Sequence, residues 1–525
     1  MNMVTTELTS YDEVPYPNYT YPQTHPDRLA TLATLFGMQP APVEHCRALE
    51  LGCGDGSNLL PMAFGLPESE FVGVDLAAHP IANGNARSAA LGLKNIELRR
   101  LDLMEIGKEI GQFDYIMVHG LYSWIPPAAR DKILAICRSS LNPQGVAYIS
   151  YNTYPGCHLR EITRQLMLFH TKDVKDSRER IAQGRALIQW LADGQTQSSA
   201  YQTFLREVSE RFKVKSHGAV FHDDLAEINA PVYFHQFVSH AAEHGLQFLS
   251  EADFFESQDY DFPEQLRHLA EQDRLTREQY LDFLKGRAFR QTLLCHHEIS
   301  LDRSVKLDRV RRFYIKSEAR PVSAAPDIKS TSVEEFRRPK EGSISTDFPL
   351  AKAALFHLSE IYPRSAHFDV LLAKACSLIG QTMSHEDFAS DEDARTFAEV
   401  MLKTYGAGVI ELHLHEPQFV VEPSEYPQAS PLARLQAQQG VIITSLFPNT
   451  IGLEDDLGRH LLVLLDGTRN RPAVLDELRK MIDSNVEESP QDEEAFTERK
   501  RFLEALPDDL ENQLNHLGRL GLLLA

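Results

Sequence analysis

A glycine-rich turn near the N-terminus is the segment whose residue types point most directly to chemistry. Residues 50–57 read ELGCGDGS, and they begin at the end of a short apolar stretch, residues 47–51, that predicts a buried strand. Glycines let the backbone turn tightly and approach a ligand where a Cβ atom would clash. The turn departs from the G-x-G-x-x-G pattern of dinucleotide enzymes. Glu50, just before the first glycine, would repel a pyrophosphate and attract a cofactor that carries a sulfonium and an ammonium group.

Two more acids follow the next two predicted strands. Asp75 ends the strand expected at 71–75, where a carboxylate can accept both ribose hydroxyls, and Asp102 follows the strand expected at 96–100, where it could receive the amine of adenine. Asp75 alone would also suit NAD, but the three acids together predict S-adenosylmethionine. We expect the cofactor to be held by Glu50, Gly52, Cys53, Gly54, Gly56, Asp75, Leu76, Asp102, Leu103 and His119.

The acceptor of such a reaction should lie after the fourth and fifth strands, expected at 115–118 and 146–150. His119 could assist proton removal through water, or it could merely cap the strand. Tyr122 and Trp124 could form a channel for an alkyl ammonium through cation–π contacts, or they could pack in the core. The expected catalytic residues are His119, Tyr122, Trp124, Asn152 and Tyr154, and Tyr151 should face the same mouth.

Other polar clusters carry a weaker signal. Residues 295–298 (CHHE) contain metal-ligand atoms, but adjacent residues on a helix point apart and no partner pair is visible. His413 and His415 share one face of a strand expected at 409–415, and without a third ligand we expect a surface pair. Arg287 and Arg290 are expected on a helix in structural salt bridges, with substrate docking as the alternative. We therefore predict no metal site.

Strands alternate with helices from residue 47 to residue 150. The strands are nearly all apolar, and the helices are expected from near 57, over 81–91 and over 130–141, which predicts an α/β fold with a parallel sheet covered on both faces. The chain is expected to become helical afterwards, with a single strand at 246–250 returning to the main sheet. The other predicted helices cover residues 27–36, 158–170, 178–193, 231–244 and parts of 263–290.

Two segments are rich in residues that disfavour long helices. Residues 11–26 are dense in Tyr and Pro, and they are either a wrapping arm or a lid that keeps water from the reacting centre. Residues 317–345 are rich in Ser, Pro, Ala and charge, which predicts an interdomain linker. Beyond it lie two helical segments with short strands, and the charge-dense residues 483–498 should form a solvated loop.

Composition limits the function classes. A chain of 525 residues suggests about three or four domains. A net charge of −22 argues against sequence-independent nucleic-acid binding, which needs a basic surface. No apolar run is long enough to span a bilayer, and the first residues lack a signal-peptide pattern. Six scattered cysteines without a C-x-x-C pair predict a reduced, cytoplasmic compartment.

At this point a family resemblance is clear. Residues 47–150 resemble a class I methyltransferase core. Residues 10–16 (SYDEVPY), 21–29 (YPQTHPDRL), 231–238 (PVYFHQFV) and 289–296 (FRQTLLCH) resemble bacterial methyltransferases with a middle "methyltransferase regulatory domain". That family includes protein lysine methyltransferases that act on bacterial outer-membrane proteins, and its C-terminal part resembles winged-helix modules. Class I amine methyltransferases often carry Asn/Asp-Pro-Pro-Tyr/Phe after the fourth strand, whereas this chain has HGLYSWIP with only Tyr122 in register.

The resemblance implies a Rossmann-like core with a lid (1–165), a helical middle domain (166–317), a linker (318–345) and two winged-helix-like modules (346–424 and 425–525). It implies in-line methyl transfer, and a protein lysine is the first expected acceptor. The alternatives are a small metabolite or natural product as acceptor, or a cofactor-binding interaction protein without turnover. For a lysine we expect a narrow aromatic tunnel, with the middle and C-terminal domains as a docking surface remote from the chemistry. Nucleic acid is not expected as a partner, and a homodimer stays open.

Overall fold

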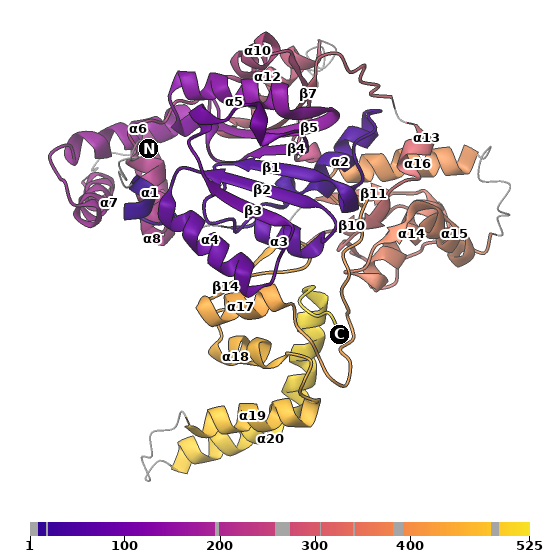
Figure 1. Cartoon of the computed structure of the whole chain (residues 1–525). Helices are drawn as coiled ribbons and strands as arrows, with labels where there is room; N and C mark the ends of the chain where they lie inside the picture. The colour runs from indigo at the N-terminus through magenta and orange to yellow at the C-terminus, as the bar shows by residue number, and fades with distance from the viewer. Residues whose placement is uncertain are drawn as a thin grey trace.

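The computed structural model describes residues 9–16, 19–194, 199–257, 273–304, 306–339, 342–381, 392–484 and 493–525. Its centre is one seven-stranded sheet, and three groups of helices extend from it (Figure 1). Helices α6–α8 lie at one end of the sheet, α14–α16 lie at the other, and α17–α20 project below. No helix in these ranges is both long and apolar enough to cross a membrane.

The sheet has the strand order β3-β2-β1-β4-β5-β7-β6, and β7 alone runs antiparallel to its two neighbours. The first five predicted strands and the returning strand are confirmed. The segment 289–296, expected to be helical at its start, is instead the strand β7, which fills the place between β5 and β6. The bounds are β1 Arg47–Leu51, β2 Glu70–Asp75, β3 Ile96–Arg100, β4 Phe113–Val118, β5 Leu141–Asn152, β6 Leu246–Glu251 and β7 Phe289–His296.

Alternate strand residues enter two different cores because successive side chains point to opposite faces. On β1, for example, Ala48 packs with α2 and α3, whereas Leu49 packs with α5 and α10. The predicted helices of the core are confirmed within a few residues. Their bounds are α2 Pro26–Leu35, α3 Leu59–Gly65, α4 Ala78–Ala90, α5 Pro127–Ser140 and α10 Phe234–Glu243.

The helices after β5 form a small bundle of their own. Its apolar cluster joins Met167, Ile188 and Phe212 from three helices with Val220. Val220 begins η6 (Val220–Asp224), a π-helical turn, which is rare and often found at functional sites. The helices are α6 Cys157–His170, α7 Ser177–Asp193, α8 Ala200–Val214, α9 His217–Ala219 and, beyond β6, α12 Arg274–Lys285. Part of the expected helical stretch, 263–272, lies outside the described residues.

The predicted linker is wrong as a description of residues 318–345. These residues carry a three-stranded antiparallel sheet of β9 (Arg320–Pro321), β10 (Glu334–Arg337) and β11 (Ser343–Thr346). Phe336 of β10 is completely buried. The buried ammonium of Lys352 donates to the carbonyls of Asp327, Ser330 and Ser332 at 2.7, 2.8 and 2.7 Å. Buried contacts of this kind hold a segment whose composition alone suggested flexibility.

The first module after it begins earlier than expected. Helices α14 (Pro349–Ile361), α15 (Phe368–Ile379) and α16 (Glu392–Gly406) pack with a sheet of order β12-β8-β13. The central strand β8 is Tyr314–Lys316, so the boundary at 317 cuts the sheet. The outer strands are β12 (Ala366–His367) and β13 (Glu411–His413). This module shares one apolar cluster with α2 and the main sheet.

The last module has its own apolar cluster, which includes Ile443, Leu462 and Leu514. Its elements are α17 Pro431–Gln439, the hairpin β14 Ile442–Thr444 with β15 Thr450–Gly452, α18 Asp456–Leu464, α19 Arg471–Ser484 and α20 Glu493–Arg519. The loop expected at 483–498 is not a loop throughout: α19 ends at Ser484, residues 485–492 lie outside the described ranges, and α20 begins at Glu493. The shorter helical turns elsewhere are α1 Ser10–Glu13, η1 Pro22–Thr24, η2 Val43–His45, η3 Leu103–Glu105, η4 Lys108–Ile110, η5 Tyr122–Trp124, η7 Phe254–Ser257 and α13 Leu307–Val310.

Candidate active site

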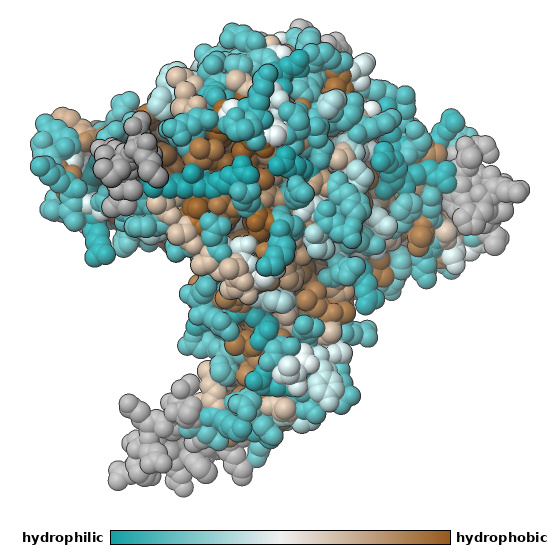
Figure 2. Space-filling model, in the orientation of Figure 1, coloured by the Kyte–Doolittle hydropathy of each residue, from teal (hydrophilic) through white to brown (hydrophobic). Residues whose placement is uncertain are grey.

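One cavity of about 1300 Å³ lies at the carboxyl ends of the central strands. This is the edge at which open α/β sheets bind their ligands. In Figure 2, apolar side chains gather in a hollow of the surface over this edge of the sheet. The lining comes from distant parts of the chain, which include the N-terminal arm, the turns after β1–β5, the π-helical turn η6, the start of β7, and α17 with the β14–β15 hairpin.

The glycine turn forms the floor of the cavity. Gly52 and Gly54 have φ of 77° and 56°, which L side chains rarely adopt, and the Gly54 amide donates to Asp75 Oδ2 at 2.8 Å. Both glycines line the cavity, as does Cys53. Gly56 does not line it. A Cβ atom there would lie 2.8 Å from Leu98, so the expected cofactor contact of Gly56 is wrong, and its role is to let the turn pack on β3.

Glu50 is the most informative side chain in the cavity. It is 3% exposed, and its Oε1 accepts from Asn58 Nδ2 at 2.8 Å. Its Oε2 is buried without a hydrogen-bond partner within the described ranges. Burial, together with the neighbouring carboxylates of Asp75 and Asp55, raises the pKa of Glu50 to about 8 against the opposing effect of the hydrogen bond from Asn58. A buried carboxyl with a spare acceptor fits the ammonium and sulfonium charges of S-adenosylmethionine.

Asp75, which ends β2, and Asp102, which follows β3, also present carboxylate oxygens at the cavity. Asp75 accepts from the amides of Gly54 and Ala77, both at 2.8 Å, and burial raises its pKa. Asp102 accepts from the amide of Met104 at 2.9 Å. Both line the cavity together with Leu76 and Leu103. Because the backbone amides fix these carboxylates, their remaining lone pairs are oriented for the ribose hydroxyls and the adenine amine.

His119 directly follows β4 and also lines the cavity. Its ring stacks on Tyr21 at 3.7 Å between centroids, and its Nδ1 lies 2.9 Å from the Tyr148 hydroxyl. That hydroxyl donates to Gln291 Oε1 at 3.0 Å, so it accepts the proton of Nδ1 and leaves Nε2 as the acceptor nitrogen. Burial lowers the pKa of His119 to about 4. The imidazole is therefore neutral at neutral pH.

Three of the aromatic residues expected at the mouth lie elsewhere. Tyr122 is 2% exposed and packs against Phe237, and Tyr151 is 1% exposed and stacks on the same ring at 4.1 Å. Tyr154 stacks on His158 at 4.1 Å, outside the lining of the cavity. The expected place of these three rings at the mouth is therefore wrong, because Phe237 of α10 and His158 of α6 hold them outside the cavity.

Trp124 and Asn152 do line the cavity. The Arg160 guanidinium lies over the Trp124 ring at 5.5 Å. The Asn152 amide donates to Ser123 Oγ at 2.8 Å, and its side-chain Nδ2 donates to Asn229 Oδ1 at 2.9 Å. The turn that carries Trp124 is thus tied to the end of β5.

The N-terminal arm lies over the cofactor half, which favours the lid over the simple wrapping arm. Tyr11 stacks on His222 of η6 at 4.0 Å, and His222 Nε2 donates to the Val14 carbonyl at 2.6 Å. Asp12 Oδ1 accepts from the His79 amide at 2.8 Å. Arg160, His222, Asp223 and Phe289 also line the cavity and were not predicted as site residues: the first three come from segments without a recognised motif, and Phe289 belongs to a segment that signalled only the family.

The C-terminal module also reaches the cavity. Gln436 and Gln439 of α17, Ile442 of β14 and Thr450 of β15 line it, and Thr450 Oγ1 lies 2.9 Å from Thr20 Oγ1 of the arm. The expectation that this module is remote from the chemistry is therefore wrong. No local pattern in residues 431–452 signals the contact, since it depends on how the domains pack.

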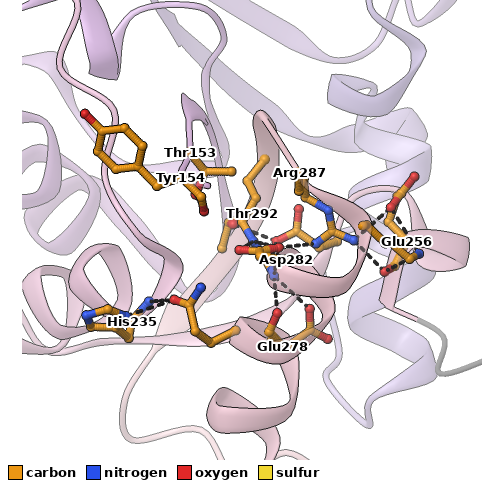
Figure 3. A network of polar contacts seen from close by, with 12 residues as sticks. Thr153, Tyr154, His235, Glu256, Glu278, Asp282, Arg287 and Thr292 are labelled. Atoms are coloured by element: carbon orange, nitrogen blue, oxygen red, sulfur yellow. Dashed lines mark hydrogen bonds and ion pairs between the residues drawn. The ribbon is translucent and has the colours of Figure 1, made fainter. Parts of the chain in front are cut away.

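The weaker clusters prove structural. Arg287 and Arg290 lie after α12 and on β7, not on a helix, and both are buried in ion pairs. Figure 3 shows Arg287 between Asp282 and Glu256, with N–O distances of 2.9 and 2.8 Å, while Tyr154 stands apart. Arg290 contacts Glu251, Glu278 and Asp282 at 2.6, 3.2 and 2.9 Å.

Two further corrections concern histidines. His413 and His415 are not a surface pair: they bond Asp27 and Glu44 at 2.7 and 2.8 Å and join β13 to the core. His296 lies on β7 instead of a helix, and its Nδ1 accepts from Arg138 Nη1 at 2.7 Å.

Comparison with known proteins agrees with this geometry. Family models described as "Methyltransferase domain", "Predicted methyltransferase regulatory domain" and "PKMT, C-terminal winged helix domain" match residues 48–145, 216–296 and 425–522. The uncharacterized protein RP789 of Rickettsia prowazekii is 33% identical over 480 residues, 89% of this chain and 85% of that protein. A tRNA (guanine-N(7)-)-methyltransferase of Chloroflexus aggregans is 32% identical over 25% of this chain and 59% of its own length.

The fold is shared nearly end to end with a solved structure, PKMT2 from Rickettsia typhi in complex with AdoHcy. The TM-score is 0.84 at 28% identity, and the match covers 97% of this chain and 100% of that one. The sheet and the cavity thus define an S-adenosylmethionine-dependent methyltransferase of class I. Within that class, the chain belongs to the family that joins the methyltransferase domain to the regulatory domain and the PKMT winged helix domain. S-adenosylmethionine is its cofactor.

Proposed function

We propose that this enzyme methylates the side-chain amine of a lysine in a protein substrate. The observation that carries the proposal is the aromatic lining of the half of the cavity that the cofactor residues leave free. The resemblance of the sequence to protein lysine methyltransferases, and the likeness to PKMT2 over almost the whole chain, support it as well.

The strand order divides the cavity into two halves. The ends of β1, β2 and β3 carry Glu50, Asp75 and Asp102, whereas the turns at β4, β5 and β7 carry His119, Asn152 and Phe289. His119 and Phe289 lie 6.1 Å apart between ring centroids. With Tyr21 and Trp124, these rings give the second half flat apolar faces, which suit the alkyl stem of a lysine and attract an ammonium through cation–π contacts.

The size of the cavity also suits two ligands. Its volume of about 1300 Å³ exceeds the roughly 300–1,000 Å³ of ordinary small-molecule sites, so an acceptor side chain fits beside the cofactor. The arm and the C-terminal hairpin border the opening, and we propose that a polypeptide lies across them while its lysine enters. This replaces the docking surface expected far from the chemistry.

The chemistry needs a neutral amine, held dry and in line. A bound cofactor would supply a methyl group on a cationic sulfur to the amine lone pair, with S-adenosylhomocysteine as the leaving group. The one proton lost overall is the proton that the lysine ammonium gives up beforehand. His119 offers its neutral Nε2 as a hydrogen-bond acceptor that orients the amine. A pKa of about 4 makes it a weak base at neutral pH, so we propose that solvent removes the lysine proton.

The setting of the reaction is proposed on separate grounds. All six cysteines are buried, which suits a reduced cytoplasm. A homodimer stays a prediction, and the net charge of −22 continues to disfavour nucleic acid as substrate.

The test uses the full chain, labelled-methyl cofactor and bacterial lysate fractionated by size. We expect label in the protein fraction, recovered as N-methyl-lysine after acid hydrolysis, and none with the variant Gly54→Val, in which a branched side chain intrudes on the cofactor's place. Label confined to the small-molecule fraction would replace the lysine with a metabolite. Protein label on a residue other than lysine would also end the proposal.

A further inference from the structure

A cluster of three metal-ligand side chains lies outside the lining of the active-site cavity. Asp131 comes from α5, His240 from α10, and His244 directly follows α10. His244 Nε2 and His240 Nε2 lie 2.8 and 3.6 Å from Asp131 Oδ1, and the three ligand atoms all lie within 4.8 Å of one another. The two histidines are four residues apart, so one helix face presents both.

We propose that Asp131, His240 and His244 bind a zinc ion. Two imidazoles and one carboxylate are a donor set that zinc prefers, and magnesium does not. In a tetrahedral site with bonds of about 2.0–2.2 Å, ligand atoms are separated by roughly 3.3 Å, a value between the 2.8 and 3.6 Å that separate Asp131 Oδ1 from the two histidines. Three protein ligands leave the fourth position to water.

A second observation supports the site independently. Metal-bound histidines almost always donate their other ring N–H to an oxygen, which fixes the tautomer. His240 Nδ1 lies 2.8 Å from the hydroxyl of Tyr122, a side chain that is 2% exposed and held by Phe237 and Tyr151. The Tyr122 hydroxyl can accept the Nδ1 proton and leave Nε2 free for the metal. This gives the buried Tyr122 a positioning role in place of the channel.

The site links three parts of the enzyme. Asp131 belongs to the methyltransferase domain and His240 to the regulatory domain, which matches residues 216–296. Tyr122 begins η5, whose last residue, Trp124, lines the active-site cavity. Bound zinc would therefore cross-link α5 to α10 and steady the turn beneath the acceptor half. The inference does not rest on the nature of the methyl acceptor.

The test is titration calorimetry of the full-length protein, stripped with a chelator, against zinc and magnesium chlorides. We expect one zinc per chain and no magnesium binding. His240→Ala and His244→Ala should each weaken zinc binding by at least about tenfold, and Tyr122→Phe by about tenfold, since supporting partners of metal ligands matter by factors of that size. His235→Ala, on the exposed face of the same helix, is the matched control and should leave the affinity unchanged.

Thermal unfolding of the same variants provides a second readout. Zinc should raise the unfolding midpoint of the wild type and of His235→Ala, but not that of His244→Ala, because a ligand stabilises only the fold that binds it. An equal midpoint for the metal-free proteins would show that the variants fold. Zinc affinity in His240→Ala and His244→Ala equal to wild type would overturn the proposal, as would an absence of zinc binding by the wild type.

Discussion

Two regions of this enzyme bury carboxylates, and they treat them in opposite ways. In the network around β7, Glu251, Glu278 and Asp282 surround the guanidinium of Arg290, which is fully buried and also lies 3.9 Å from the Phe234 ring. Burial disfavours the charged form, but these carboxylates outweigh it and raise the pKa of Arg290. In the cavity, Glu50 has only an amide partner, and its second oxygen has no partner among the described residues.

The two regions show two different consequences of burying a carboxylate. A carboxylate that finds its cation inside the protein stabilises the fold and can be replaced only together with that cation. A carboxylate buried without one costs stability, and such a cost persists where a ligand supplies the missing charge. The paired carboxylates around Arg290 join β7 and α12 to β6, whereas the unpaired carboxylate of Glu50 indicates where the cofactor binds.

The largest expected effect is the loss of stability when the ion pairs around Arg290 are removed. Arg290→Met should lower the free energy of unfolding by about 3–5 kcal/mol, because it leaves buried carboxylates without their cation. Denaturant titration of the full chain measures it. The control is Arg99→Met, which breaks an exposed pair with Glu97 and should cost about 1 kcal/mol or less. A similar small loss for both variants would mean that the network does not stabilise the fold.

The next largest effect is on cofactor binding alone, and it distinguishes Glu50 from the carboxylates around Arg290. Glu50→Gln should weaken S-adenosylmethionine binding by about 1.5–3 kcal/mol, the range for hydrogen bonds to charged groups, without lowering the free energy of unfolding. Calorimetry measures the first quantity and denaturant titration the second. Glu97→Gln, on the exposed pair, should leave cofactor binding unchanged and lower the free energy of unfolding by about 1 kcal/mol or less. If Glu50→Gln bound the cofactor as tightly as wild type, the carboxylate would have no part in the site.

Proton release on cofactor binding tests whether the cofactor supplies the cation that Glu50 lacks. Glu50 has a pKa of about 8 without ligand, so it is mostly protonated at pH 7. A cation bound beside it lowers that pKa, and binding should release up to one proton per site at pH 7. Calorimetry in two buffers of different ionisation enthalpy counts these protons. Glu50→Gln should abolish the release, and an unchanged count in that variant would assign the proton to another group.

The smallest effect concerns the arm over the cavity. His222→Ala removes the ring that stacks on Tyr11 and the bond to the Val14 carbonyl, and it should weaken cofactor binding by about 0.5–1.5 kcal/mol, the value of one aromatic pair. The dissociation rate should rise more than the association rate falls, because the arm covers the bound ligand. Stopped-flow displacement measures this rate. A slower dissociation in the variant would argue that the arm does not act as a lid.

The cofactor half of the site was predictable from the sequence because its signals are local. Glu50, Gly52, Gly54, Asp75 and Asp102 all stand at the ends of strands that apolar runs identify, and a parallel sheet brings such ends to one edge. The strand at 246–251 was predictable for the same reason, since a glycine after a helix and a short apolar run mark it.

Other features were decided by the tertiary structure alone. Residues 289–296 mix polar and apolar side chains without a clear period, which does not separate a helix from a strand, and only the place between β5 and β6 makes this segment β7. The strand ends placed Tyr122 near the mouth, but Phe237 and His240 of a distant helix turned its ring into the core. The β14–β15 hairpin reached the cavity only through domain packing. Sequence spacing determines what lies at the end of a strand, whereas the direction of a side chain depends on partners from elsewhere in the chain.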